Sequence, residues 1–289
     1  MQSIALDRTR AFYDLTKPGI TRMVLVTTAA GFYLATRGSV DFLLLINTLL
    51  GTALAASGTN ALNQWAERDL DSRMKRTANR PLPSGRLDSR QAFLFAWGIS
   101  MAGLAYLIAY VNLATAIVVA VSLSSYVFIY TPLKTKTWIS TLIGAVPGAL
   151  PILAGWTASG QPVTPAAWAL FAIMFVWQMP HFYALAWIYR EDYGRAGFQM
   201  LTVVDATGAR AARHSLLFTA MLIPISVLPT VFGVAGNVYL VGAVLMGIAF
   251  LVLTTGMLRQ PSERVAWRIF TGSIVYLPLL LALMVLDKP

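Results

Sequence analysis

The residues of this sequence that are best suited to chemistry lie in the segment NQWAERDLD. If a helix continues through this segment, Asn63, Glu67 and Asp71 are spaced by four residues and share one face. An amide oxygen and two carboxylates are hard ligands of the kind that Mg²⁺ takes together with substrate phosphates. Asp69 points roughly the opposite way, and we expect it to pair with a neighbouring arginine such as Arg73.

A basic loop, SRMKRTANRPLPSGR, follows these acids directly. Its Lys75, Arg76 and Arg80 are candidate ligands for the oxygens of a diphosphate, so that acids and cations together would form a magnesium-diphosphate site. The alternative is a solvated helix end that carries the positive charges typical of cytoplasmic loops. Carboxylates at a membrane border are costly and tend to be functional, which favours the site.

A second acidic cluster flanked by cations follows a later apolar run, and its members are Arg190, Glu191, Asp192 and Arg195. Glu191 and Asp192 are candidate ligands for a second metal ion, and Arg195 is a candidate diphosphate contact. Between the two clusters, the segment YTPLKTKTW adds Lys134 and Lys136 as further candidate diphosphate contacts.

The chain has two histidines. His181 is expected inside the helix bundle, where it is either a hydrogen-bonded structural residue, an acid–base group, or a metal or haem ligand. His214 lies beside Arg210 and Arg213 and is expected at the membrane interface.

The composition shows what must position these residues. The chain has 289 residues, of which 57% are hydrophobic and only 12% charged. Its apolar runs of roughly 20 residues recur along the whole length, as bilayer-spanning helices require. We therefore predict an all-α polytopic membrane protein with a single domain over residues 1–289. The absence of cysteine excludes disulfides, thiolate metal sites and a cysteine nucleophile.

Nine spans are predicted, at 20–37, 41–64, 91–111, 113–130, 138–157, 165–188, 214–233, 237–257 and 267–286. This arrangement places 20 of the 22 Lys and Arg residues on the side of the N-terminus, and only Arg37 and Lys288 opposite. Such an asymmetry assigns the first side to the cytoplasm, together with the loops 65–90 and 189–213 that carry the site residues. A bacterial plasma (inner) membrane is the expected location.

The stretch NQWAERDLDSRMKRTANRPLPSGR resembles the first Asp-rich motif of the UbiA-type intramembrane prenyltransferases. Within that superfamily, YTPLKTKTW, GAVPGALPILAGW and PHFYALAWIYREDYGRAGFQML are similar to the branch that farnesylates haem. The resemblance runs from roughly residue 14 to residue 285. The superfamily's second motif is usually Asp-x-x-x-Asp, whereas here the residues four away from Asp192 are Ile188 and Ala196, so that only Glu191 and Asp192 remain.

The resemblance implies nine helices in one bundle around a central cavity. It implies farnesyl diphosphate as donor, haem b as acceptor, Mg²⁺ as cofactor and haem O as product. Carried over by position, Asn63, Glu67 and Asp71 would hold Mg²⁺ and diphosphate, Asp192 would belong to the second metal site, and these four form the expected catalytic set. His181 would contact haem. From its charge, Arg190 is a candidate partner for the haem propionates.

Several alternatives remain open from the sequence. A prenyltransferase of the same architecture that uses an aromatic acceptor of the 4-hydroxybenzoate type would share the first motif, and only the block 180–201 favours the haem branch. A phosphatidyl-type transferase would need an Asp-Gly-x-x-Ala-Arg pattern, and the chain contains no Asp-Gly. A transporter would place charges near mid-membrane. Expected partners are membrane lipid and an acceptor enzyme or oxidase assembly partner for haem O, with no nucleic acid.

Overall fold

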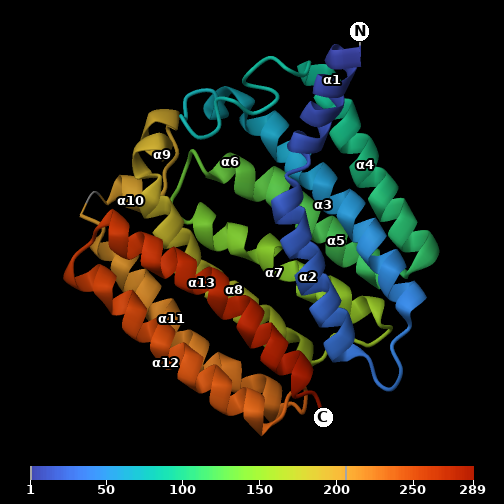
Figure 1. The fold of residues 1–289 in the computed structure, drawn as a ribbon, viewed down its shortest axis with the longest axis vertical. Helices are drawn as coiled ribbons and strands as arrows, with labels where there is room; N and C mark the ends of the chain where they lie inside the picture. The colour runs from blue at the N-terminus through green and yellow to red at the C-terminus, as the bar shows by residue number, and fades with distance from the viewer. Residues whose placement is uncertain (1, 206) are drawn as a thin grey trace.

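The computed structural model describes residues 2–205 and 207–289, and within these residues every regular element is helical (Figure 1). The elements in chain order are α1 (Gln2–Leu15), α2 (Pro18–Ala35), α3 (Phe42–Asp71), α4 (Ser89–Tyr110), α5 (Leu113–Ser124), the π-helical segment η1 (Ser125–Tyr130), α6 (Thr131–Leu133), α7 (Ser140–Ala158), α8 (Pro165–Ile188), α9 (Arg190–Ala196), α10 (Leu201–Val204), α11 (Ala209–Val231), α12 (Asn237–Arg259) and α13 (Glu263–Leu286).

Eight helices among the described residues are long and apolar enough to cross a membrane, which confirms the prediction of an all-α polytopic protein. Each coincides with a predicted span, and α5, η1 and α6 together form one of them, Leu113–Leu133. The remaining predicted span, 20–37, is α2, which has 18 residues, carries Arg22 and is not among the eight. The predicted number of nine is therefore not confirmed.

Helix α3 is longer than a bilayer requires, and this length positions the acidic residues. Asp41 begins the helix by accepting a hydrogen bond from the backbone N–H of Leu44 at 2.9 Å. The 30 residues that follow correspond to about 45 Å of helix, against about 30 Å for the hydrocarbon core of a bilayer. Its last turns can therefore reach past the apolar layer, and these turns carry Asn63, Glu67 and Asp71.

The middle of the bundle is formed by α7 and α8, whose apolar stretches are 78% and 61% buried, against 28–39% for the other six spans. Helix α2 packs closely along α7, because glycines lie where the two backbones meet. A Cβ atom at Gly155 would collide with the carbonyl oxygen of Thr28, and one at Gly31 would collide with that of Ile152. Small residues at such crossings allow membrane helices to approach each other closely.

A central cavity of about 630 Å³ lies between α2, α3, α5, η1, α7, α8 and α13. Its walls are mainly aliphatic and aromatic, with a few polar side chains. The lining residues include Asn60, Tyr126, Tyr130, Trp177, His181, Phe182 and Phe270. The cavity expected from the sequence is therefore present.

The two long connections meet at one end of the bundle, which we call the loop end and define by residues 72–88, 189–205 and 207–208 (Figure 1). The backbone N–H of Arg76 donates to Asp192 Oδ2 at 3.3 Å, although the two residues are 116 positions apart. Met74 packs with Phe198 and Met200 in a small apolar cluster beneath them. The N-terminus lies at the loop end and the C-terminus at the opposite end (Figure 1).

The α2–α7 crossing gives a test of this packing. We expect Gly155→Ala to lower the stability of the purified protein by about 1–3 kcal/mol, because the new methyl group forces the two helices apart. Gly98→Ala is the matched control, since Gly98 also lies within a span and a Cβ there has no atom within 4 Å. That variant should be neutral or slightly more stable. Equal melting temperatures for the two variants would contradict the proposed close contact.

Candidate functional site

The acidic face predicted on α3 is formed as expected, because the helix continues to Asp71. Asn63, Glu67 and Asp71 are buried, with 1%, 4% and 0% of their surfaces exposed. The side chain of Asp69 is 79% exposed and lies outside this face, as predicted. Its partner is Arg68, at 3.8 Å, so a neighbouring arginine pairs with it as expected, but this arginine is not Arg73. Arg68 directly precedes Asp69 in the chain, whereas Arg73 follows it by four residues.

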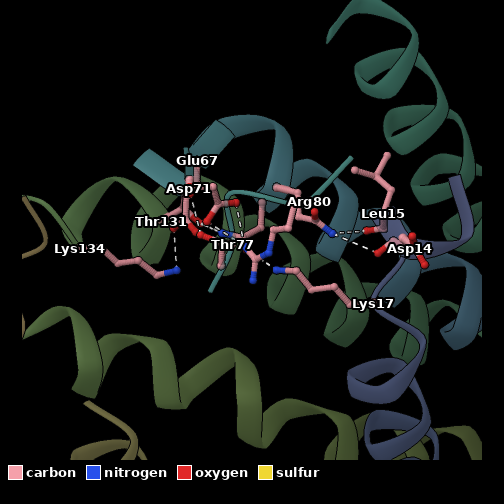
Figure 2. A network of polar contacts seen from close by, with 11 residues as sticks. Asp14, Leu15, Lys17, Glu67, Asp71, Thr77, Arg80, Thr131 and Lys134 are labelled. Carbon is pink, nitrogen blue, oxygen red and sulfur yellow. Dashed lines mark hydrogen bonds and ion pairs between the residues drawn. The ribbon is translucent and has the colours of Figure 1, made fainter. Parts of the chain in front are cut away.

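Each carboxylate of this face is neutralised by a cation from another segment (Figure 2). Lys134 Nζ lies 2.6 Å from Glu67 Oε1, and Arg80 Nη1 lies 2.8 and 2.7 Å from the two carboxylate oxygens of Asp71. Burial alone would lower the pKa of Lys134, but the charge of Glu67 outweighs it and raises that pKa above its usual range. These pairs bring two of the predicted diphosphate contacts, Arg80 and Lys134, directly to the acids.

A third cation, Lys17, was not identified from the sequence. Its Nζ donates to Asn63 Oδ1 at 2.9 Å. Burial, reinforced by the positive charge of Arg80, lowers the pKa of Lys17 to about 7. The only sequence signal was a lysine directly before Pro18, at the start of the first span, where it reads as an ordinary cytoplasmic charge.

The backbone at Lys17 is held in an unusual conformation that aims this side chain. With φ of 49°, Lys17 is the only described residue other than glycine with a positive φ. A residue before proline disfavours the right-handed helical region, and the left-handed region costs a lysine some free energy. Such strain persists where the surroundings enforce it, often at functional sites. Here the chain turns from α1 into α2 and directs the lysine toward α3.

The π-helical segment η1 completes this side of the site. Thr131 donates to the carbonyl oxygen of Tyr126, five residues earlier, at 2.8 Å, and accepts from Asn63 Nδ2 at 3.2 Å. Tyr126 and Tyr130 line the central cavity, and Lys134 Nζ lies 4.4 Å from the centre of the Tyr130 ring. Single π-helical turns are frequent at functional sites. This one joins the polar site to the cavity.

The second acidic cluster reaches the same end of the bundle but is only partly turned inward. Asp192 is buried, forms an ion pair with Arg195 and accepts from the backbone of Arg76. Glu191, the preceding residue of α9, is exposed. Within residues 2–205 and 207–289, no three His, Asp or Glu side chains converge as a ready metal-binding group. Asp192 is therefore better placed than Glu191 to complement the α3 face.

The remaining predicted cations are more peripheral. Lys75, Arg76 and Arg190 line a polar cavity of about 520 Å³ at the loop end, beside Glu191 and Arg195. Arg76 lies 4.8 Å from the Tyr189 ring and Arg190 lies 4.3 Å from the Trp187 ring. Lys136 is exposed and forms no ion pair within the described part of the chain.

The two histidines have different surroundings. His181 faces the central cavity, and its Nδ1 lies 2.8 Å from Ser273 Oγ. His214 Nδ1 lies 3.2 Å from the Tyr183 hydroxyl, and its ring contacts Trp138 edge-on. His181 is thus the histidine that a molecule in the cavity would meet.

The site therefore combines a buried acidic helix face, cations paired with it, and an adjoining apolar cavity. The profile of the UbiA prenyltransferase family matches residues 24–283. The chain belongs to this family. The family assignment covers both the α3 face and the cavity, and it confirms the resemblance found in the sequence.

Family members with high similarity span the whole chain. The chain is 45% identical to a protoheme IX farnesyltransferase of Solibacter usitatus, over 97% of this chain and 99% of the relative. It is 42% identical to a protoheme IX farnesyltransferase of Salinibacter ruber, over 94% of this chain and 96% of the relative. The corresponding protein of Aquifex aeolicus is 40% identical, with 96% and 95% covered.

Solved structures share the fold of this family member. A digeranylgeranylglyceryl phosphate synthase superposes with a TM-score of 0.82 at 16% identity, over 97% of this chain and 98% of the other. A UbiA homologue from Archaeoglobus fulgidus bound to GPP and Mg²⁺ superposes with a TM-score of 0.71 at 17% identity, over 95% and 99%. At such low identity these likenesses establish the architecture alone.

The Glu67–Lys134 pair can be tested through stability. We expect Lys134→Met to lower the free energy of unfolding by about 3–5 kcal/mol, because it leaves a buried carboxylate without its counter-charge. The double variant Lys134→Met/Glu67→Gln should recover most of the loss. Lys136→Met, on the same loop but exposed, should change stability by less than about 0.5 kcal/mol. If Lys134→Met proves as stable as Lys136→Met by denaturant unfolding, the pair does not stabilise the fold.

Proposed function

We propose that this protein transfers a farnesyl group from farnesyl diphosphate to a vinyl group of haem b, with addition of water, to give haem O and diphosphate. The observation that carries the proposal is a buried acid-and-cation site at one end of an apolar cavity that also presents a histidine. The near-full-length identity with relatives named protoheme IX farnesyltransferase supports this choice of donor and acceptor within the family.

The donor set on α3 fits Mg²⁺. Asn63, Glu67 and Asp71 offer one amide oxygen and two carboxylates on a single buried face, and cations that suit phosphate oxygens adjoin them. One or two carboxylates with substrate phosphates and water are the usual surroundings of this ion. Mg²⁺ bound here would offset the negative charge that grows on the diphosphate as the allylic bond breaks. Asp192 faces the same loop and would hold a second ion.

The cations of the site would bind the diphosphate itself. Arg80 and Lys134 lie directly against the acids, and Lys17 lies against Asn63, so that all three surround the position where a metal-bound diphosphate would sit. Their charges would stabilise the leaving group most strongly as the bond breaks. Arg195 lies beside Asp192. The further candidates Lys75, Arg76 and Lys136 are exposed and would guide the anion as it approaches.

The cavity would hold the farnesyl chain and keep water from the cation that forms. Its volume of about 630 Å³ falls within the range of small-molecule sites. The rings of Tyr126, Tyr130, Trp177 and Phe270 line it. Aromatic faces attract cations, and a dry site prevents premature hydrolysis.

Haem b would occupy the same cavity as acceptor. His181 would contact the haem from α8, and Arg190 at the loop end is a candidate partner for a propionate.

The protein is a multi-pass membrane protein. We place it in a bacterial inner membrane with the N-terminus and the loop end in the cytoplasm, because 20 of the 22 Lys and Arg residues belong to that side.

One incubation tests the reaction. Purified protein with haem b, farnesyl diphosphate and Mg²⁺ should yield a haem species heavier by a farnesyl group plus water, detected by mass spectrometry. Addition of a chelator in excess over Mg²⁺ should stop its formation. A parallel incubation with 4-hydroxybenzoate should yield no product. Prenylated 4-hydroxybenzoate with unchanged haem would assign the protein to the aromatic-acceptor class instead.

The role of the α3 face is tested by Asp71→Ala. We expect turnover to fall by about 100-fold or more, because the variant loses a metal ligand and releases Arg80 from its position. Asp69→Asn, on the same helix but exposed, should retain full activity. Both variants should insert into the membrane equally well. Activity near that of the unmodified protein in Asp71→Ala, at saturating Mg²⁺, would remove Asp71 from the site.

A further inference from the structure

The hydrogen bond between His181 and Ser273 determines which nitrogen of the imidazole carries a proton. Ser273 Oγ donates its only hydrogen to the carbonyl oxygen of Phe270, at 2.6 Å. The same oxygen lies 2.8 Å from His181 Nδ1, and it can only accept there because its hydrogen is already used. His181 therefore carries its proton on Nδ1.

Nε2 of His181 is left with a free lone pair. A neutral imidazole has one donor and one acceptor nitrogen, so Nε2 is the acceptor. Within residues 2–205 and 207–289, no protein group bonds to it and no acidic side chain contacts the ring. The neighbouring rings belong to Trp177, Phe182 and Phe270. A second proton would create a charge among apolar groups, which is costly without a counter-ion.

The imidazole is also fixed in position. It stacks on Trp177 with ring centres 5.4 Å apart and lies against Phe270 at 4.8 Å. Trp177 Nε1 in turn donates to the carbonyl oxygen of Ser273 at 2.9 Å. Helices α8 and α13 are thus tied together beside His181, and the ring contacts and the Ser273 hydrogen bond hold the imidazole in place.

We propose that Ser273 is a positioning residue that holds His181 in the Nδ1–H form, so that Nε2 binds the iron of haem b as an axial ligand. The inference rests on the proposed function, since it requires haem in the cavity. Neutral imidazole nitrogen is a common metal ligand, and the hydrogen bond on the other ring nitrogen sets its orientation and basicity. Asn60 and Tyr130 line the same cavity, so a macrocycle held at His181 would share the space that adjoins the acidic site.

The test uses purified protein loaded with haem b in the absence of farnesyl diphosphate. Resonance Raman spectra of the ferrous form should show an iron–histidine stretch in the unmodified protein. His181→Gly should lose this band and regain an iron–imidazole band when free imidazole is added, which also shows that the cavity is intact. The band's absence from the unmodified protein, or its persistence in His181→Gly, would overturn the ligation.

Variants of Ser273 test the positioning role. Ser273→Ala should keep histidine ligation but shift the stretch to lower frequency and weaken the Kd for haem about 10-fold, because the imidazole loses the acceptor that orients it. Ser273→Thr retains a hydroxyl and should restore both. Ser100→Ala removes another buried serine hydroxyl, on α4, and should change neither. An unchanged frequency and Kd in Ser273→Ala would overturn the positioning role.

The two proposals fail in different ways. Haem O made by a protein without the iron–histidine band would overturn this inference and leave the proposed function standing. A protein that shows the band but forms no haem O with farnesyl diphosphate and Mg²⁺ would support the ligation and overturn the proposed reaction.

Discussion

The site depends on one constraint: a charge buried in this bundle must be compensated by another charge or by hydrogen bonds. The end of α3 carries two buried carboxylates, and each is neutralised by a cation from outside the helix. Arg80 comes from the loop after α3, and Lys134 comes from the end of α6. Lys17, before α2, binds the amide that completes the face. Four segments are thereby held together by the same requirement.

The helix packing serves this arrangement from the apolar side. Glycines let α2 approach α7, which brings the start of α2 and its preceding lysine against α3. The π-helical segment η1 places two tyrosines against the cavity. It also precedes Thr131, whose hydroxyl accepts a hydrogen bond from the Asn63 amide. The same helices therefore place the cavity next to the charged site. A reaction that separates charge can begin at the polar border and proceed in an apolar space.

The sequence was sufficient wherever the determining relation is local. Hydropathy over about twenty residues located the spans. The spacing of four residues within one helix placed Asn63, Glu67 and Asp71 on one face. Relations across the fold could not be read in this way. Nothing near Lys17 shows that it meets a residue 46 positions later, and only the fold selects Lys134 over Lys136 as the partner of Glu67.

The pairing of acids with cations has a consequence for the order in which ligands can enter. Because each carboxylate of the α3 face has a counter-charge, a metal ion that bound alone at the proposed site would have to displace a lysine or an arginine. A diphosphate arriving alone must likewise take a cation away from a buried acid. If both bound as one complex, the acids and the cations could exchange partners without leaving a buried charge unpaired. The proposed site would therefore take up a metal ion and a diphosphate together more readily than either one alone.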